Sequence, residues 1–137
     1  MFVRRPVTRW VTGGLGVLAV VMGTFGAINP AAQAGMMGLL ATGGQSLGGH
    51  TAELLVITSL AAVNTGTLYL VGAVKQWSGF VAWAMTARFI MGAGLLALVL
   101  SAQAPHAFIG AAAWEWLGAM IIGLSCRWDR GRATIYA

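Results

Sequence analysis

The stretch 79-GFVAWAMTARFIMGAGLLALVLS-101 decides the fold of this chain. It contains a single charged residue, Arg88, and as a helix it can cross the hydrocarbon core of a bilayer, which takes about 20 apolar residues. Lipid offers no hydrogen-bond partners to an exposed backbone, so the stretch is expected to be an α-helix that spans a membrane.

Three further apolar stretches have the length of a membrane span, and they cover residues 10–28, 51–74 and 107–126. Of the 137 residues, 58% are apolar and only 8% are charged, against about 25% charged in soluble domains. So few charges cannot coat a soluble globule of this size. The sequence therefore predicts an all-α integral membrane four-helix bundle that forms a single transmembrane domain over residues 1–137.

The first apolar stretch also resembles a secretory signal. Arg4 and Arg5 precede it, and Ala32-Gln33-Ala34 has the pattern of a cleavage site. A signal's apolar region is shorter than a full span, whereas this one is long enough to cross the bilayer. We therefore expect it to be retained as the first membrane helix.

The connections between the predicted spans differ in length. Short connections at 75–78 and 103–106 make the second, third and fourth helices antiparallel neighbours. The longer loop at 29–50 contains Pro30, an apolar piece at 31–41 and glycine pairs at 43–44 and 48–49. This pattern predicts a short interfacial helix between glycine hinges, which serves either as a lid over an opening between the spans or as a connector resting on the membrane.

Lys and Arg residues predict the orientation in the membrane. The chain has 8 Lys and Arg against 3 Asp and Glu, and all of the cations except Arg88 flank the spans on one side. They are Arg4, Arg5, Arg9, Lys75, Arg127, Arg130 and Arg132. By the positive-inside rule both termini are expected to be cytoplasmic, in a bacterial inner membrane or an endoplasmic reticulum membrane. The aromatic side chains do not alternate with these cations as a surface for stacking bases would require, so nucleic-acid binding is rejected.

A few polar residues fall inside the predicted spans. Arg88, Asn64 and Glu115 lie deep, whereas His50 and Glu53 lie near the outer end of the second span. A charge at the bilayer centre costs roughly 2.5–3.5 kcal/mol on insertion scales, so these side chains should point inward and pair. We expect Arg88 to pair with Glu115 and Asn64, at the bottom of a polar cavity that opens to the outer side and is closed on the cytoplasmic side.

These residues suggest a small membrane-embedded enzyme that acts on a lipophilic small molecule. A carboxyl group in apolar surroundings can hold and donate a proton near neutral pH, which suits isomerisation, cyclisation or epoxide opening. Glu115 would be the acid and Glu53, with His50, the base. The expected substrate-binding residues are Arg88, Asn64, Trp83, Trp114 and Trp116, although the tryptophans would equally suit packing against lipid.

Two other functions remain open. The Arg88–Glu115 pair would also suit a non-catalytic accessory or assembly subunit of a larger membrane complex, where it would only join two helices. A small proton-coupled exporter is the third candidate, with Glu115 as the titrating group. The expected partners are membrane lipid and a lipophilic substrate, with a second copy of the chain or a membrane complex as further candidates.

The sequence lacks the motifs of several common enzyme classes. It contains no G-x-x-x-x-G-K-[ST] phosphate loop, no G-x-S-x-G nucleophile motif and no H-E-x-x-H zinc motif. Cys126 is the single cysteine, so no cysteine-based metal site or internal disulfide can form. We therefore expect neither a metal nor a cofactor.

Overall fold

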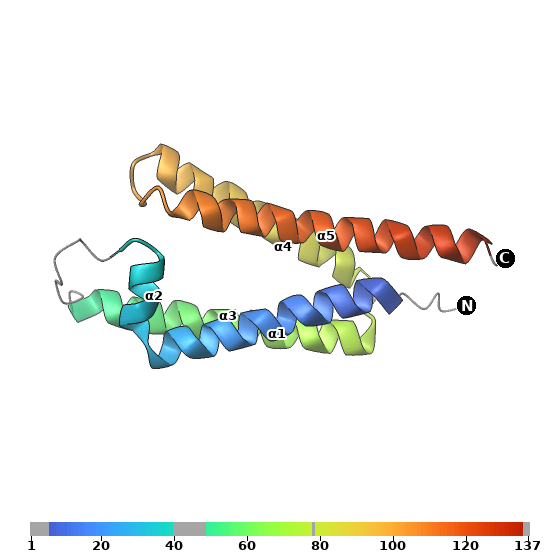
Figure 1. The fold of residues 1–137 in the computed structure, drawn as a ribbon, viewed down its shortest axis with the longest axis horizontal. Helices are drawn as coiled ribbons and strands as arrows, with labels where there is room; N and C mark the ends of the chain where they lie inside the picture. The colour runs from blue at the N-terminus through green and yellow to red at the C-terminus, as the bar shows by residue number, and fades with distance from the viewer. Residues whose placement is uncertain (1–5, 40–48, 78, 136–137) are drawn as a thin grey trace.

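The computed structural model describes residues 6–39, 49–77 and 79–135, which form five helices and no strand (Figure 1). These helices are α1 (Pro6–Ile28), α2 (Pro30–Met36), α3 (Gly49–Lys75), α4 (Phe80–Leu100) and α5 (Phe108–Ile135). All of them except α2 are long and apolar enough to cross a membrane. The chain is thus an all-α four-helix membrane bundle, as the sequence predicts.

Each predicted apolar stretch coincides with one helix. The helix α4 is one residue shorter at each end than the stretch 79–101, and α5 begins one residue later than expected and continues beyond residue 126 as far as Ile135. Large apolar side chains remain exposed along all four long helices, among them Ile28, Ile57, Ile90 and Leu124. Such an outer surface suits lipid rather than water.

The long helices pack as two pairs, α1 with α3 and α4 with α5 (Figure 1). Glycine allows the first pair to approach closely. A Cβ atom added to Gly16 would lie 2.9 Å from the Gly66 carbonyl oxygen, and one added to Gly66 would lie 2.7 Å from the Gly16 carbonyl oxygen. The two backbones therefore touch at this level, a common way for helices to associate in lipid.

The pairs meet at the end of the bundle where α1 begins and α5 ends, which we call the terminal end (Figure 1). There Asp129 of α5 accepts hydrogen bonds from the Thr8 amide at 2.9 Å, the Thr8 hydroxyl at 2.8 Å and the Val7 amide at 3.3 Å. The first amides of a helix have no partner within it, and a carboxylate suits the positive end of the helix dipole. Asp129, only 3% exposed, thus caps α1 from a helix more than a hundred residues away in sequence.

The opposite end of the bundle, which we call the loop end, contains α2. The Asn29 side chain caps α2 by accepting from the Ala32 amide at 3.1 Å, and the helix is held on α3 because the Ser59 hydroxyl donates to Gln33 Oε1 at 2.7 Å. The predicted short helix thus exists, but it ends at Met36 rather than at residue 41. Residues 40–48, with most of the predicted glycine hinges, lie outside the described residues.

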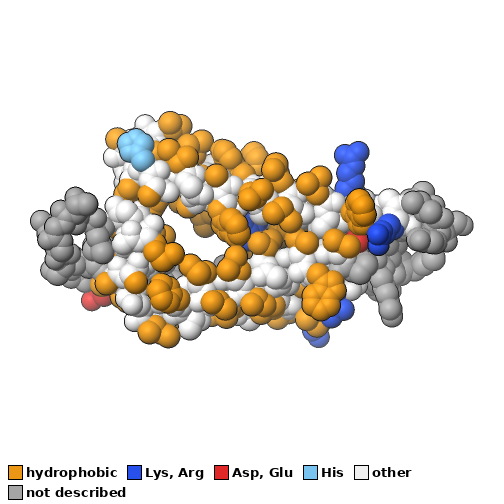
Figure 2. Space-filling view, in the orientation of Figure 1, with side chains coloured by type: hydrophobic (Ala, Val, Ile, Leu, Met, Phe, Trp, Pro, Cys, Tyr) orange, Lys and Arg blue, Asp and Glu red, His pale blue; other side chains and the backbone are white. Residues whose placement is uncertain are grey.

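Between the two helix pairs the molecule is hollowed, and hydrophobic side chains form much of the visible edge (Figure 2). On the terminal side of this hollow the pairs are joined by a small core of Tyr69, Phe80, Ala84 and Ile122. The hollow is therefore closed on its terminal side by this core, and on its loop side the chain after α2 approaches the other pair, where a Cβ atom added to Gly38 would lie 3.3 Å from the Ala107 Cβ atom (Figure 2).

Candidate functional site

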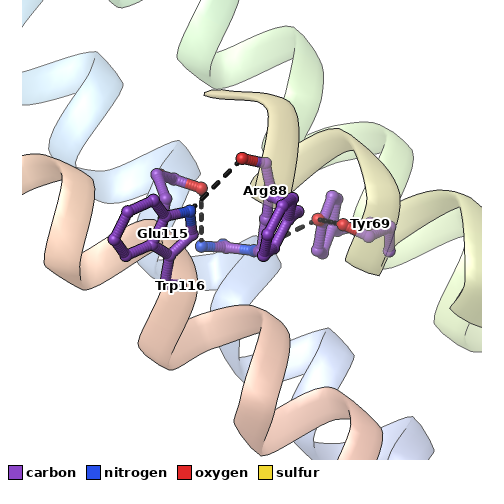
Figure 3. A network of polar contacts seen from close by, with 6 residues as sticks. Tyr69, Arg88, Glu115 and Trp116 are labelled. Carbon is purple, nitrogen blue, oxygen red and sulfur yellow. Dashed lines mark hydrogen bonds and ion pairs between the residues drawn. The ribbon is translucent and has the colours of Figure 1, made fainter. Parts of the chain in front are cut away.

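Arg88 lies close to the middle of α4 and connects three helices (Figure 3). Its Nη1 donates to Glu115 Oε2 of α5 at 3.0 Å, so the predicted pairing of these two residues is confirmed. The two side chains are only 11% and 24% exposed, and a charge-assisted hydrogen bond is strong where water is scarce. The pair therefore fixes the position of the guanidinium within the span.

Tyr69 of α3 is the second partner of Arg88. The Arg88 Nε donates to the Tyr69 hydroxyl oxygen at 3.2 Å, and the guanidinium carbon lies 5.4 Å from the centre of the Tyr69 ring. The hydroxyl in turn donates to the Ala84 carbonyl oxygen at 3.3 Å. We call Tyr69, Arg88 and Glu115 the Arg88 network, and it joins α3 to the α4–α5 pair (Figure 3).

The sequence predicts Asn64 in the place that Tyr69 takes. Asn64 precedes Tyr69 by five residues, which turns its side chain by about 140° around α3, and it is exposed on the outside of the bundle. The predicted contact between Asn64 and Arg88 is therefore wrong. The sequence could have indicated Tyr69 as a partner of Arg88 by its depth in the membrane. The two residues lie at similar distances along the chain from the turn that joins α3 to α4.

Glycine makes room for the guanidinium on α5. A Cβ atom added to Gly118 would lie 2.6 Å from Arg88 Nη1 and 3.0 Å from its guanidinium carbon. Gly118 lies one turn from Glu115 on the same face of α5. Because it has no side chain, the Arg88 side chain can lie flat between α4 and α5.

The three tryptophans predicted to bind substrate occupy different places. The Trp116 indole Nε1 donates to the Phe89 carbonyl oxygen at 3.3 Å, and the two rings stack with centres 6.0 Å apart. Trp83 stacks on Phe80 and contacts Tyr69, which places it beside the small core. Trp114 is substantially exposed. Trp83 and Trp116 thus adjoin the Arg88 network, and nothing joins Trp114 to it among the described residues.

His50 and Glu53 form their own contact at the loop end of α3. His50 Nδ1 lies 3.4 Å from Glu53 Oε2, and the side chains are 96% and 73% exposed. Glu53 precedes Tyr69 by sixteen residues, or about 24 Å along the helix axis, and faces the opposite side of α3. The structure therefore does not bring Glu53 and His50 together with Glu115, and their role as a base stays a prediction.

The direction in which one face of α3 points explains why neither Asn64 nor Glu53 reaches the Arg88 network. Glu53 and Asn64 share a face, as their spacing of eleven residues predicts, but that face points away from α4 and α5. The predicted series of polar side chains descending into the cavity is thus reduced to its deepest members, Arg88 and Glu115, with Tyr69 added. His106 is exposed in the turn before α5.

The Arg88 network keeps unused hydrogen-bonding capacity. A guanidinium has five N–H donors, and the bonds to Glu115 and Tyr69 use two of them. No buried side-chain nitrogen or oxygen in the described part of the chain lacks a partner, so Arg88 Nη2 and the second Glu115 oxygen, which make no hydrogen bond, are not fully buried. The site can therefore bind an oxygen acceptor and exchange a proton with the bound molecule.

Residues 6–39, 49–77 and 79–135 contain no group of three His, Cys, Asp or Glu side chains that could bind a metal ion. Cys126 is a free, buried thiol. The candidate site thus consists of one carboxyl, one guanidinium and one phenol. No protein-family model, curated protein or solved structure matches this chain.

Proposed function

We propose that this chain is a membrane-embedded enzyme that binds a lipophilic small molecule between its two helix pairs and transfers protons on it. The observation that carries the proposal is the Arg88–Glu115 pair, which lies inside the span and still has free, reachable donor and acceptor atoms. Ionisable groups at such depth are costly and are by default candidates for function. The apolar edge of the hollow suits the remainder of a lipophilic ligand.

The chemistry proposed for the site uses one carboxyl rather than two. Arg88 would hold a carbonyl oxygen of the ligand, and the Glu115 carboxylate would take a proton from a neighbouring carbon. The electron pair moves onto that oxygen, where the guanidinium stabilises the charge. The proton on Glu115 then exchanges with water, and Glu115 delivers a solvent-derived proton to a different carbon. A single group that removes one proton and delivers another suits a double-bond isomerisation better than a cyclisation or an epoxide opening.

Tyr69 would be a positioning residue in this reaction. Its hydroxyl proton is directed to the Ala84 carbonyl, while its oxygen and ring hold the guanidinium. Arg88 is thereby fixed from the side opposite Glu115, which keeps its remaining donors directed in one orientation.

The proposed orientation places both termini in the cytoplasm. Its support is that α1 begins and α5 ends at the same end of the bundle as the turn containing Lys75, with cations in each of these segments (Figure 1). The ligand would then enter from the lipid or from the outer side. Fusion of a reporter to the C-terminus, active only in the cytoplasm, tests this orientation, and an inactive fusion to a correctly inserted chain contradicts it.

Deuterium exchange tests the proposed reaction and does not require an identified substrate. The purified chain in lipid nanodiscs is incubated in deuterated water with a lipophilic extract of its host membranes, and the products are analysed by mass spectrometry. We expect one compound to gain deuterium in the presence of the wild type and of Glu53→Gln, but not of Glu115→Gln. No gain with a folded wild-type protein contradicts the proposal, and loss with Glu53→Gln restores the two-carboxylate mechanism.

An accessory role in a larger membrane complex is the second candidate. The observation that favours it is that the Arg88 network joins the two helix pairs. In that case Glu115→Gln weakens the bundle and releases co-purifying subunits. A proton-coupled exporter would instead show flux in vesicles that depends on a proton gradient and disappears in Glu115→Gln.

A further inference from the structure

Asn64 presents an amide side chain to the outside of the bundle in the middle of a membrane span. It lies two residues from residue 62, the midpoint of α3 (Gly49–Lys75), and it is exposed. Ser59 and Gly66 mark the side of α3 that faces α1 and α2, and Tyr69 marks the side that faces α4. Asn64 lies on the remaining face and has no partner among the described residues.

This face carries a regular stripe. Exposed side chains recur along α3 at intervals of three and four residues, and we call them the α3 stripe. Its members are Ile57, Leu60, Asn64, Thr67, Val71 and Val74. Alternating steps of three and four residues are the spacing of helices that pair side by side, and one asparagine at such a seam sets register and partner number.

We infer that two copies of this chain pair in the membrane through the α3 stripe, with the two Asn64 amides hydrogen-bonded to each other. Lipid provides no partner for an amide, which has donors as well as an acceptor, so an exposed Asn64 favours association. Two copies inserted in the same orientation place this residue at the same depth, and an amide complements another amide across a two-fold axis. Another protein would need its own polar group at that depth.

The pairing leaves the candidate site free. The stripe lies on the side of α3 opposite Tyr69, so a second copy would cover neither the Arg88 network nor the hollow. This inference is thus independent of the proposed reaction, and each can fail without the other.

Cysteine crosslinking tests which face meets the second copy. In a Cys126→Ala background, Thr67→Cys lies on the stripe, and Ile90→Cys is a matched control on the outer face of α4. Each of these positions lies two residues from a member of the Tyr69–Arg88 contact, which puts them at similar depth. We expect oxidation in membranes to give a disulfide-linked dimer with Thr67→Cys and not with Ile90→Cys. Equal crosslinking of the two, or none with Thr67→Cys, overturns the inference.

A dilution series in liposomes tests the role of the amide. Fluorescently labelled chains are reconstituted at decreasing protein-to-lipid ratio, and single-molecule photobleaching counts the copies in each spot. Asn64→Leu should raise the dimer dissociation constant by about 5- to 30-fold, and Asn64→Gln should retain pairing. Since Asn64→Leu removes a polar group from a lipid-facing position, it should not unfold the monomer. An unchanged constant, or a wild type that stays monomeric at every ratio because its partner is a different protein, overturns the inference.

Discussion

Replacement of Asp129 by alanine removes the cap of α1 and the polar connection between the first and last helices. The carboxylate accepts two short hydrogen bonds from Thr8 and one longer bond from Val7. A hydrogen bond to a charged group contributes about 1.5–3 kcal/mol, and loss of a helix cap costs about 0.5–2 kcal/mol. Because water at the helix end can partly replace the lost acceptor, we expect Asp129→Ala to lower the free energy of unfolding by about 2–3 kcal/mol.

A graded series makes this prediction specific. Asp129→Asn keeps one acceptor oxygen without the charge and should cost about 1 kcal/mol, and Thr8→Val removes only the hydroxyl bond and should cost a similar amount. Denaturant unfolding in detergent micelles, followed by circular dichroism, gives all three values. If Asp129→Ala unfolds within about 0.5 kcal/mol of the wild type, which is the range of ordinary surface substitutions, Asp129 does not stabilise the start of α1.

Three further substitutions test the packing around the site. Gly118→Ala places a methyl group against Arg88 Nη1, so we expect deuterium exchange to fall about tenfold or more and stability by about 1–3 kcal/mol; exchange at the wild-type rate contradicts the role of Gly118. Tyr69→Phe removes one partner of Arg88 Nε and should lower exchange severalfold while the protein still binds its ligand, as measured by mass spectrometry of retained ligand; complete loss of binding would place Tyr69 in direct ligand contact instead. Gly66→Leu forces α1 from α3 and should destabilise the bundle by about 3 kcal/mol or more in the same unfolding assay, and a wild-type value would mean that the two helices are not in close contact.

The sequence was sufficient for the spans because their length and composition leave no other structure. Residues 79–101 contain one charge, and lipid excludes any backbone that does not satisfy its own hydrogen bonds. The same cost of a buried charge predicted the pairing of Arg88 with Glu115, since neither group has another opposite charge at its depth. Both predictions rest on the large free-energy cost of an unsatisfied backbone group or an unpaired charge in lipid, which outweighs the preferences of individual side chains.

The orientation of α3 could not be predicted in this way. In a membrane helix both the lipid-facing and the protein-facing sides are apolar, so hydrophobic periodicity does not tell them apart. Glu53 and Asn64 were correctly assigned to one face, but Gly16 and Gly66 determine which side of α3 turns toward α1. That contact directs Tyr69 to Arg88 and leaves Asn64 outside.

Asp129 was missed for a different reason. Helix caps are usually sought within a few residues of the helix start, where Ser, Thr, Asp or Asn would stand. Here the acceptor comes from α5, more than a hundred residues later in the sequence. Only the packing of α1 against α5 brings the two together, and no spacing rule in one sequence contains that information.

The central claim is that the Arg88–Glu115 pair performs chemistry and does more than join helices. The double variant Arg88→Met/Glu115→Leu tests it directly, because replacing a partly buried ion pair by apolar side chains of similar size is often neutral for stability. The measurement is the rate of deuterium incorporation into the extracted ligand, per amount of folded protein. We expect a stable bundle whose incorporation falls to the level without protein. A stable double variant that incorporates deuterium at the wild-type rate would contradict the claim.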